Sequence, residues 1–147
     1  MFSPFSDQEL GLALGASETS RRVQKHLSGL FEELTISKDR FGRFGVEFAG
    51  EPSSMTGFTP VSRFTSRLTY VEVDGVLVGR VVFEMPDGET QKPFFSLQIY
   101  RDGRLRNGDE GDQYWQLDGY DDSEALERLV KSLVIGQLRV HMAEMAK

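Results

Sequence analysis

The sequence predicts an α+β domain: an N-terminal helix, then an antiparallel meander of four to five strands, then a long C-terminal helix packed on the sheet. Residues 17–35 and 121–145 repeat apolar side chains at helical spacing. Between them, β-rich runs alternate with tight turns. A length of 147 residues, 39% of them hydrophobic and 27% charged, is typical of one globular domain, so we expect residues 1–147 to fold as a unit.

The residues before the first helix leave two alternatives open. Ser6 and Glu9 form the Ser-x-x-Glu pattern of a capping box, in which each side chain satisfies a free backbone N–H group at a helix start. Gly11 and Gly15 oppose a helix, because each costs about 1 kcal/mol relative to alanine. Residues 1–16 are therefore predicted to be a short helix or a flexible arm. The helix that follows has one apolar face, made of Val23, Leu27, Leu30, Phe31 and Leu34.

The first predicted strand covers residues 43–48, where Phe44, Val46 and Phe48 alternate with smaller or polar side chains. The next segment, residues 49–66, is rich in Gly, Pro, Ser and Thr, which is typical of a loop. A loop of about 18 residues is close to the length at which loops are functional, mobile or wrongly assigned. We expect this long loop to separate the first strand from the rest of the sheet.

A β-hairpin is the strongest local prediction. Residues 68–73 and 76–85 are β-rich, and only the Asp-Gly pair at 74–75 separates them. Both residues of such a pair adopt the positive φ angles of a type I′ turn. Alternation along the next strand places Phe94 and Phe95 on opposite faces. The later strands are predicted at residues 94–100, 104–106 and 113–117.

The last helix is predicted to begin at Asp121, with Glu124 completing a second capping box, and to continue to about residue 145. Its apolar arc is wider than the stripe of somewhat more than 100° that a helix lying on a sheet requires. We expect the first helix to cover the second apolar side, and a homodimer is the alternative. The residues of this core or dimer face are Ile135, Leu138, Met142 and Met145.

Negative charge is concentrated late in the chain. Residues 102–127 hold nine acidic side chains against Arg104 and Arg106, although the whole chain carries a net charge of only −6. Such a segment would be repelled by the phosphates of nucleic acid and would steer a basic protein toward it. The segment therefore fits a protein partner with a basic surface, and a solvated surface that serves only solubility is the alternative. The acidic charge does not favour a nucleic-acid partner.

Motifs for catalysis are missing from the sequence. Cysteine is absent, which excludes disulfides, thiol nucleophiles and thiolate metal sites. The two histidines, His26 and His141, belong to no Gly-x-Ser-x-Gly or His-Glu-x-x-His pattern, and no glycine-rich phosphate loop is present. We expect no enzymatic activity, no metal and no cofactor.

These observations favour a non-enzymatic protein-interaction module, acting as a regulator, inhibitor, immunity protein or chaperone. Aromatic side chains within the acidic segment would anchor the partner, and the carboxylates would steer it. The predicted partner-binding residues are Asp109, Glu110, Asp112, Tyr114, Trp115, Tyr120 and Asp121.

Two resemblances give alternative functions. The run Gly-Arg-Phe-Gly-Val-Glu-Phe at residues 42–48 resembles the aromatic strand of RNA-recognition motifs, which implies single-stranded nucleic acid stacked on an open sheet. The order of helix and meander is similar to cystatin-like cone folds, which implies a small-ligand cavity between sheet and helix. Its lining would be Tyr70, Tyr100, Tyr114 and Trp115.

The location of the protein is also predicted from absences in the sequence. No run of about 18 apolar residues is long enough to cross a membrane. The N-terminus lacks the basic and apolar regions of a signal peptide. We therefore expect a cytoplasmic protein.

Overall fold

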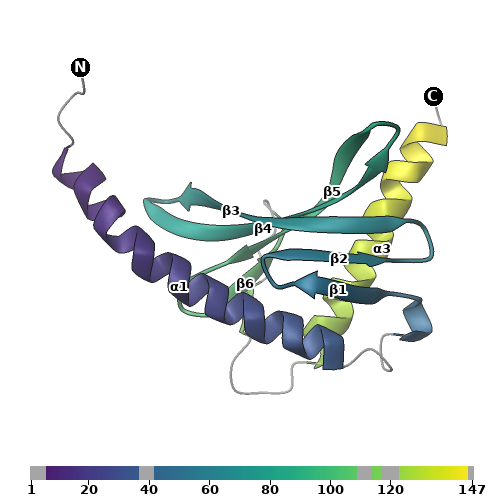
Figure 1. Cartoon of the computed structure of the whole chain (residues 1–147), viewed down its shortest axis with the longest axis horizontal. Helices are drawn as coiled ribbons and strands as arrows, with labels where there is room; N and C mark the ends of the chain where they lie inside the picture. The colour runs from purple at the N-terminus through teal and green to yellow at the C-terminus, as the bar shows by residue number, and fades with distance from the viewer. Residues whose placement is uncertain (1–5, 37–41, 109–113, 117–122, 146–147) are drawn as a thin grey trace.

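The computed structural model describes residues 6–36, 42–108, 114–116 and 123–145 (Figure 1). One antiparallel sheet, with its strands in the order of the sequence, lies between an N-terminal and a C-terminal helix along the chain. The predicted α+β class and element order are confirmed, with more strands than the four to five expected. The elements are α1 (Asp7–Ile36), η1 (Gly42–Phe44), β1 (Glu47–Glu51), β2 (Ser54–Phe58), β3 (Arg63–Val73), β4 (Val76–Asp87), β5 (Thr90–Ile99), β6 (Arg104–Asn107), β7 (Tyr114–Gln116) and α3 (Ser123–Met145).

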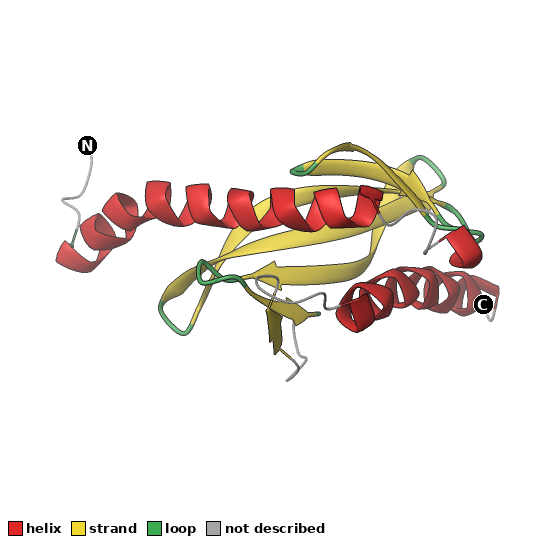
Figure 2. Ribbon diagram, turned by 90° about the horizontal axis from the view of Figure 1, so that it is seen from below, coloured by secondary structure: helices red, strands yellow, loops and turns green. Residues whose placement is uncertain are grey.

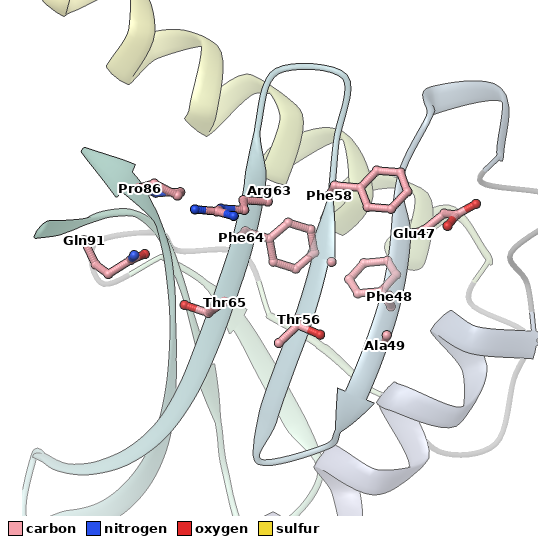
Figure 3. Close-up of a pocket in the computed structure, with 11 residues that line it drawn as sticks. Glu47, Phe48, Ala49, Thr56, Phe58, Arg63, Phe64, Thr65, Pro86 and Gln91 are labelled. Atoms are coloured by element: carbon pink, nitrogen blue, oxygen red, sulfur yellow. The ribbon is translucent and has the colours of Figure 1, made fainter. Parts of the chain in front are cut away.

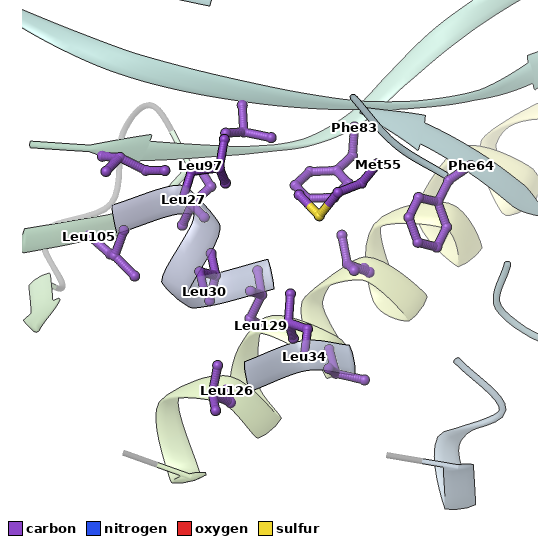
Figure 4. Close-up of a cluster of buried hydrophobic side chains, with 14 of the residues drawn as sticks. Leu27, Leu30, Leu34, Met55, Phe64, Phe83, Leu97, Leu105, Leu126 and Leu129 are labelled. Atoms are coloured by element: carbon purple, nitrogen blue, oxygen red, sulfur yellow. The ribbon is translucent and has the colours of Figure 1, made fainter. Parts of the chain in front are cut away.

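Both helices lie on the same face of the sheet (Figures 2 and 4). Leu27, Leu30 and Leu34 of α1 join Leu126 and Leu129 of α3 in one buried cluster. Burying one such side chain stabilises the fold by roughly 1.5–3 kcal/mol. The sheet supplies the other wall of this cluster with Met55, Phe64, Val81, Phe83, Leu97, Ile99 and Leu105.

Helix α1 is longer than the predicted helix, because it begins at Asp7 and runs without a break to Ile36. The predicted capping box is present: the Ser6 Oγ accepts a hydrogen bond from the Glu9 N–H at 3.1 Å, and the Ser6 N–H donates to the Glu9 carboxylate at 3.3 Å. Of the two alternatives for residues 1–16, the helix is therefore correct from Asp7 onward, as the first turns of α1. This end of α1 projects past the sheet (Figure 1).

The prediction of a long loop over residues 49–66 is wrong. The segment contains most of β1, all of β2 and the start of β3, and the strand expected from residue 43 begins only at Glu47, after a 3₁₀ turn. Met55 is fully buried and Phe64 is 1% exposed. These strands have one buried face, and Ala, Ser and Thr are frequent on the other face beside Phe58 and Arg63. Composition alone therefore made them resemble a loop.

The predicted hairpin between β3 and β4 is confirmed, with φ angles of 52° at Asp74 and 79° at Gly75. The next strand pair contains a β-bulge that the sequence did not reveal. Phe83 pairs with Phe95, whereas Glu84 already pairs with Pro93, so Phe94 is the extra residue. The prediction that Phe94 and Phe95 face opposite sides is wrong, because both rings pack against Phe83, at centroid distances of 6.3 and 5.9 Å.

Gln137 of α3 is a fully buried polar residue that fixes the turn between β2 and β3. Its amide nitrogen donates to the carbonyl oxygens of Ser62 and Arg63, each at 3.3 Å. Its carbonyl oxygen accepts a hydrogen bond from the Thr59 hydroxyl. The position of the β2–β3 turn relative to α3 therefore depends on one side chain.

Replacing Gln137 with leucine is expected to destabilise the protein. Leucine would remove the Gln137 donor from the Ser62 and Arg63 carbonyl oxygens and the Gln137 acceptor from the Thr59 hydroxyl. Losing these buried hydrogen bonds costs about 1–3 kcal/mol of unfolding free energy. Urea denaturation measures this loss. Gln24→Leu, on the exposed face of α1, is the matched control and should change stability by no more than about 0.5 kcal/mol. Equal stabilities for the two variants would contradict the anchoring role of Gln137.

Two glycine substitutions, one at the contact between α1 and β4 and one on the exposed side of α1, are expected to change stability in opposite directions. A Cβ at Gly79 would lie 2.4 Å from the Cγ1 of the buried Val23, whereas a Cβ at Gly29 would meet nothing within 4 Å. We expect Gly79→Ala to lower the unfolding free energy by about 1–3 kcal/mol through overpacking. Gly29→Ala should raise it by about 0.5–1 kcal/mol through helix propensity. Urea denaturation of both variants checks the two signs, and a Gly79→Ala protein as stable as the wild type would show that α1 does not press on β4 there.

Candidate functional site

Helix α3 presents three apolar side chains to solvent on the side opposite its buried face. Ile135 is 47% exposed, Leu138 is 40% exposed and Met142 is 64% exposed. Their spacing of three and four residues places them on one stripe. The expectation that α1 would cover this second side is wrong for these three residues, because α1 joins α3 in the core cluster through the opposite side of the helix. The side chain of Met145 lies outside the described residues.

The same face of α3 is basic. Arg128, Lys131 and Arg139 are exposed and, at helical spacing, lie among the apolar side chains of the stripe. Lys131 Nζ lies 3.8 Å from the Glu127 carboxylate and 5.6 Å from the centre of the Phe44 ring. From residue 128 to residue 143 the sequence contains no Asp or Glu. We call the exposed residues Arg128, Lys131, Ile135, Leu138, Arg139 and Met142 the α3 face.

A hollow of about 490 Å³ adjoins the α3 face where the helix meets β4 and β5. Ile135 and Arg139 line both the hollow and the α3 face, and Arg80 lines the hollow from β4. The helix comes close to the strand at Gly136, where a Cβ would lie 2.7 Å from the carbonyl oxygen of Phe94. The hollow therefore extends the α3 face into a concave surface with a third arginine, Arg80.

A second hollow, of about 480 Å³, lies on the other face of the sheet, over β1, β2 and β3 (Figure 3). We call it the outer hollow. Phe58, which is 49% exposed, and Pro86 supply apolar surface. Arg63, Thr65 and Gln91 supply polar groups. The sequence did not predict this site, because its residues belong to the segment predicted as a loop and to the β4–β5 hairpin.

The predicted acidic partner-binding edge can be followed only in part. Tyr114 and Trp115 lie in β7, where Tyr114 pairs with Arg106 and Trp115 pairs with Leu105. Their side chains are outside the described part of the structure. The other predicted residues of this edge, Asp109, Glu110, Asp112, Tyr120 and Asp121, also lie outside the described residues.

The aromatic residues of the two alternative functions have structural contacts. Phe48 packs edge-on against Phe64 at 5.6 Å, on the helix side of the sheet, and Val46 is 1% exposed. The Tyr70 hydroxyl lies 3.0 Å from the Ser20 hydroxyl and ties β3 to α1. Tyr100 lies beneath the Arg104 guanidinium at 4.7 Å. Phe48, Val46, Tyr70 and Tyr100 therefore all take part in the packing of the fold.

The two histidines lie on different helices, α1 and α3. The His26 ring nitrogen lies 3.2 Å from the carbonyl oxygen of Arg101, and His141 is exposed near the end of α3. In the described ranges, no group of three or more His, Asp or Glu side chains is placed to hold a metal ion. None of the described helices is long and apolar enough to span a membrane.

Comparisons with protein-family models, with curated proteins and with solved structures find no match to this chain. Its function therefore has to be inferred from its own surfaces. Two of them combine concave shape, apolar side chains and charge: the α3 face with its adjoining hollow, and the outer hollow.

Proposed function

We propose that this protein is a protein-interaction module whose α3 face binds an acidic, amphipathic helical segment of a partner protein. The observation that carries the proposal is the exposed stripe of Ile135, Leu138 and Met142. Single exposed apolar side chains are common on soluble proteins, but a contiguous apolar patch rimmed by charge is typical of an interaction surface. Among the described residues, α1 already shares the sheet face with α3, and the stripe is more apolar surface than packing of α3 against one sheet requires.

The shape of the α3 face favours a helical ligand. The face runs from Arg128 to Met142, a length of about 21 Å at 1.5 Å per residue. The hollow beside Ile135 widens it into a groove between the helix and strands β4 and β5. Amphipathic helices bind such grooves through apolar anchors spaced three, four and seven residues apart.

The charge of the α3 face favours an acidic ligand. Arg128, Lys131 and Arg139 flank the apolar stripe, although the whole chain has a net charge of −6. Guanidinium groups bind carboxylates with paired, charge-assisted hydrogen bonds. Complementary charge at the rim of an interface mainly raises the association rate and excludes wrong partners.

The acidic edge remains a second proposal for the same class of function. In the described residues, β7 is the last strand of the sheet and pairs only with β6. An edge strand carrying Tyr114 and Trp115 suits contact with another protein. Its partner would be basic, so the two surfaces would bind segments of opposite charge.

Site-specific photo-crosslinking in the native cell tests the α3 face. With benzoylphenylalanine in place of Met142, we expect cross-links to an acidic, amphipathic segment of another protein, mapped by mass spectrometry. A purified peptide of that segment should then bind the wild-type protein. The same probe at Glu89, in the exposed β4–β5 turn, is the control and should not label that segment. Cross-links to a second copy of this chain alone, or to basic segments, would contradict the proposal.

Substitutions in the α3 face should weaken the binding of the mapped peptide. Leu138→Glu places a carboxylate in the stripe, and we expect its affinity to fall at least about tenfold, as for a central interface anchor. Arg139→Glu should lower the association rate and its dependence on salt. Leu10→Glu changes another exposed leucine, on the projecting end of α1, and should leave affinity unchanged. Equal affinities for the Leu138 and Leu10 variants would refute the assignment.

A further inference from the structure

We propose that the outer hollow is a binding site for a small monocarboxylic acid with an apolar body. The hollow holds about 480 Å³, which is within the range of small-molecule sites, roughly 300–1,000 Å³. It lies on the face of β1–β3 that α1 and α3 do not cover, so it is separate from the α3 face.

Cross-strand register creates the hollow. Ala49, Thr56 and Thr65 pair with one another across β1, β2 and β3 and form a row of small side chains on the uncovered face. The neighbouring row on the same face contains the larger Phe58 and Arg63, which pair with each other. A row of small residues beside a row of large ones leaves a step, and the β4–β5 hairpin adds a second wall at Pro86 (Figure 3).

Two polar side chains, Arg63 and Gln91, lie toward the same end of the hollow (Figure 3). Arg63 extends toward Pro86, and Gln91 lies on the same side (Figure 3). Within the described part of the chain, neither the Arg63 guanidinium nor the Gln91 amide is held by another side chain. By contrast, Arg67, the next but one residue on the same face of β3, donates to Glu84 at 2.6 Å. Arg63 therefore offers an available guanidinium in a hollow that the Gln91 amide also lines, and both groups are donors suited to a carboxylate.

The other end of the hollow favours a ligand whose remaining atoms are apolar and carry no second negative charge. Phe58 and Ala49 line it with apolar surface. Glu47 pairs with Phe58 on the far side from Arg63, so a second negative group at that end would be repelled. An extended peptide would bring several backbone N–H and C=O groups into this apolar stretch without partners, which is costly. A compact acid with one charged group avoids that cost.

The probe for this site is 3-phenylpropionate, titrated into the ¹⁵N-labelled full chain and followed by NMR. We expect saturable shift changes centred on Ala49, Thr56 and Thr65. The neutral 3-phenylpropionamide should bind at least about tenfold more weakly, because it lacks the charge-assisted hydrogen bond to Arg63. No saturable change in the hollow, or equal binding of the acid and its amide, would overturn the proposal.

Matched arginine variants separate the site from general surface charge. Arg63→Gln should weaken binding of 3-phenylpropionate at least about tenfold, whereas Arg67→Gln removes the same charge four residues away and should not. Leu138→Glu should bind the acid like the wild type, so failure here and failure of the α3 face are distinguishable. Equal effects of the Arg63 and Arg67 variants would overturn the proposal. Tighter binding of the peptide N-acetyl-Ala-Ala-Phe than of 3-phenylpropionate would also overturn it.

Discussion

The fold depends on one constraint: two helices share a single face of one sheet. Leu30 of α1 and Leu129 of α3 are both fully buried in the cluster that also contains Phe83 of the sheet. Because one cluster buries the apolar faces of both helices and of the sheet, each helix needs only one apolar stripe. The uncovered face of β1–β3 and the far side of α3 are then left to solvent. Both candidate sites lie on surfaces that this arrangement leaves open.

Much of this architecture could be predicted from local sequence, because the features concerned are local. The Ser6–Glu9 cap and the Asp-Gly turn at residues 74–75 involve residues at most three positions apart, and both are present as predicted. The loop prediction for residues 49–66 was wrong because the burial of this segment is set by tertiary contacts. Met55 is buried only because β2 pairs with β3 beneath the helices, and threonine and serine on the other face masked the alternation. The bulge at Phe94 likewise depends on how two distant strands align.

The two candidate sites differ in how far sequence could reveal them. The surplus apolar arc of α3 was visible in the periodicity, but its exposure depends on where α1 docks. The basic character of the same face was also visible, as 16 residues without an acid in a chain of net charge −6. The outer hollow could not be predicted, because the row from Ala49 to Thr65 exists only through the register of three strands. A one-residue slip in that register would move Arg63 to the opposite face.

An acidic protein can still bind an acidic partner if its charges are segregated. At physiological ionic strength the screening length is about 8 Å, which is shorter than the α3 face, about 21 Å long. A partner seated there therefore responds to Arg128, Lys131 and Arg139 more than to distant carboxylates. Net charge acts mainly at longer range, where it weakens attraction before contact. Recognition at the α3 face would then rest on apolar anchoring by Ile135 and Leu138, with the arginines setting the register of the bound helix.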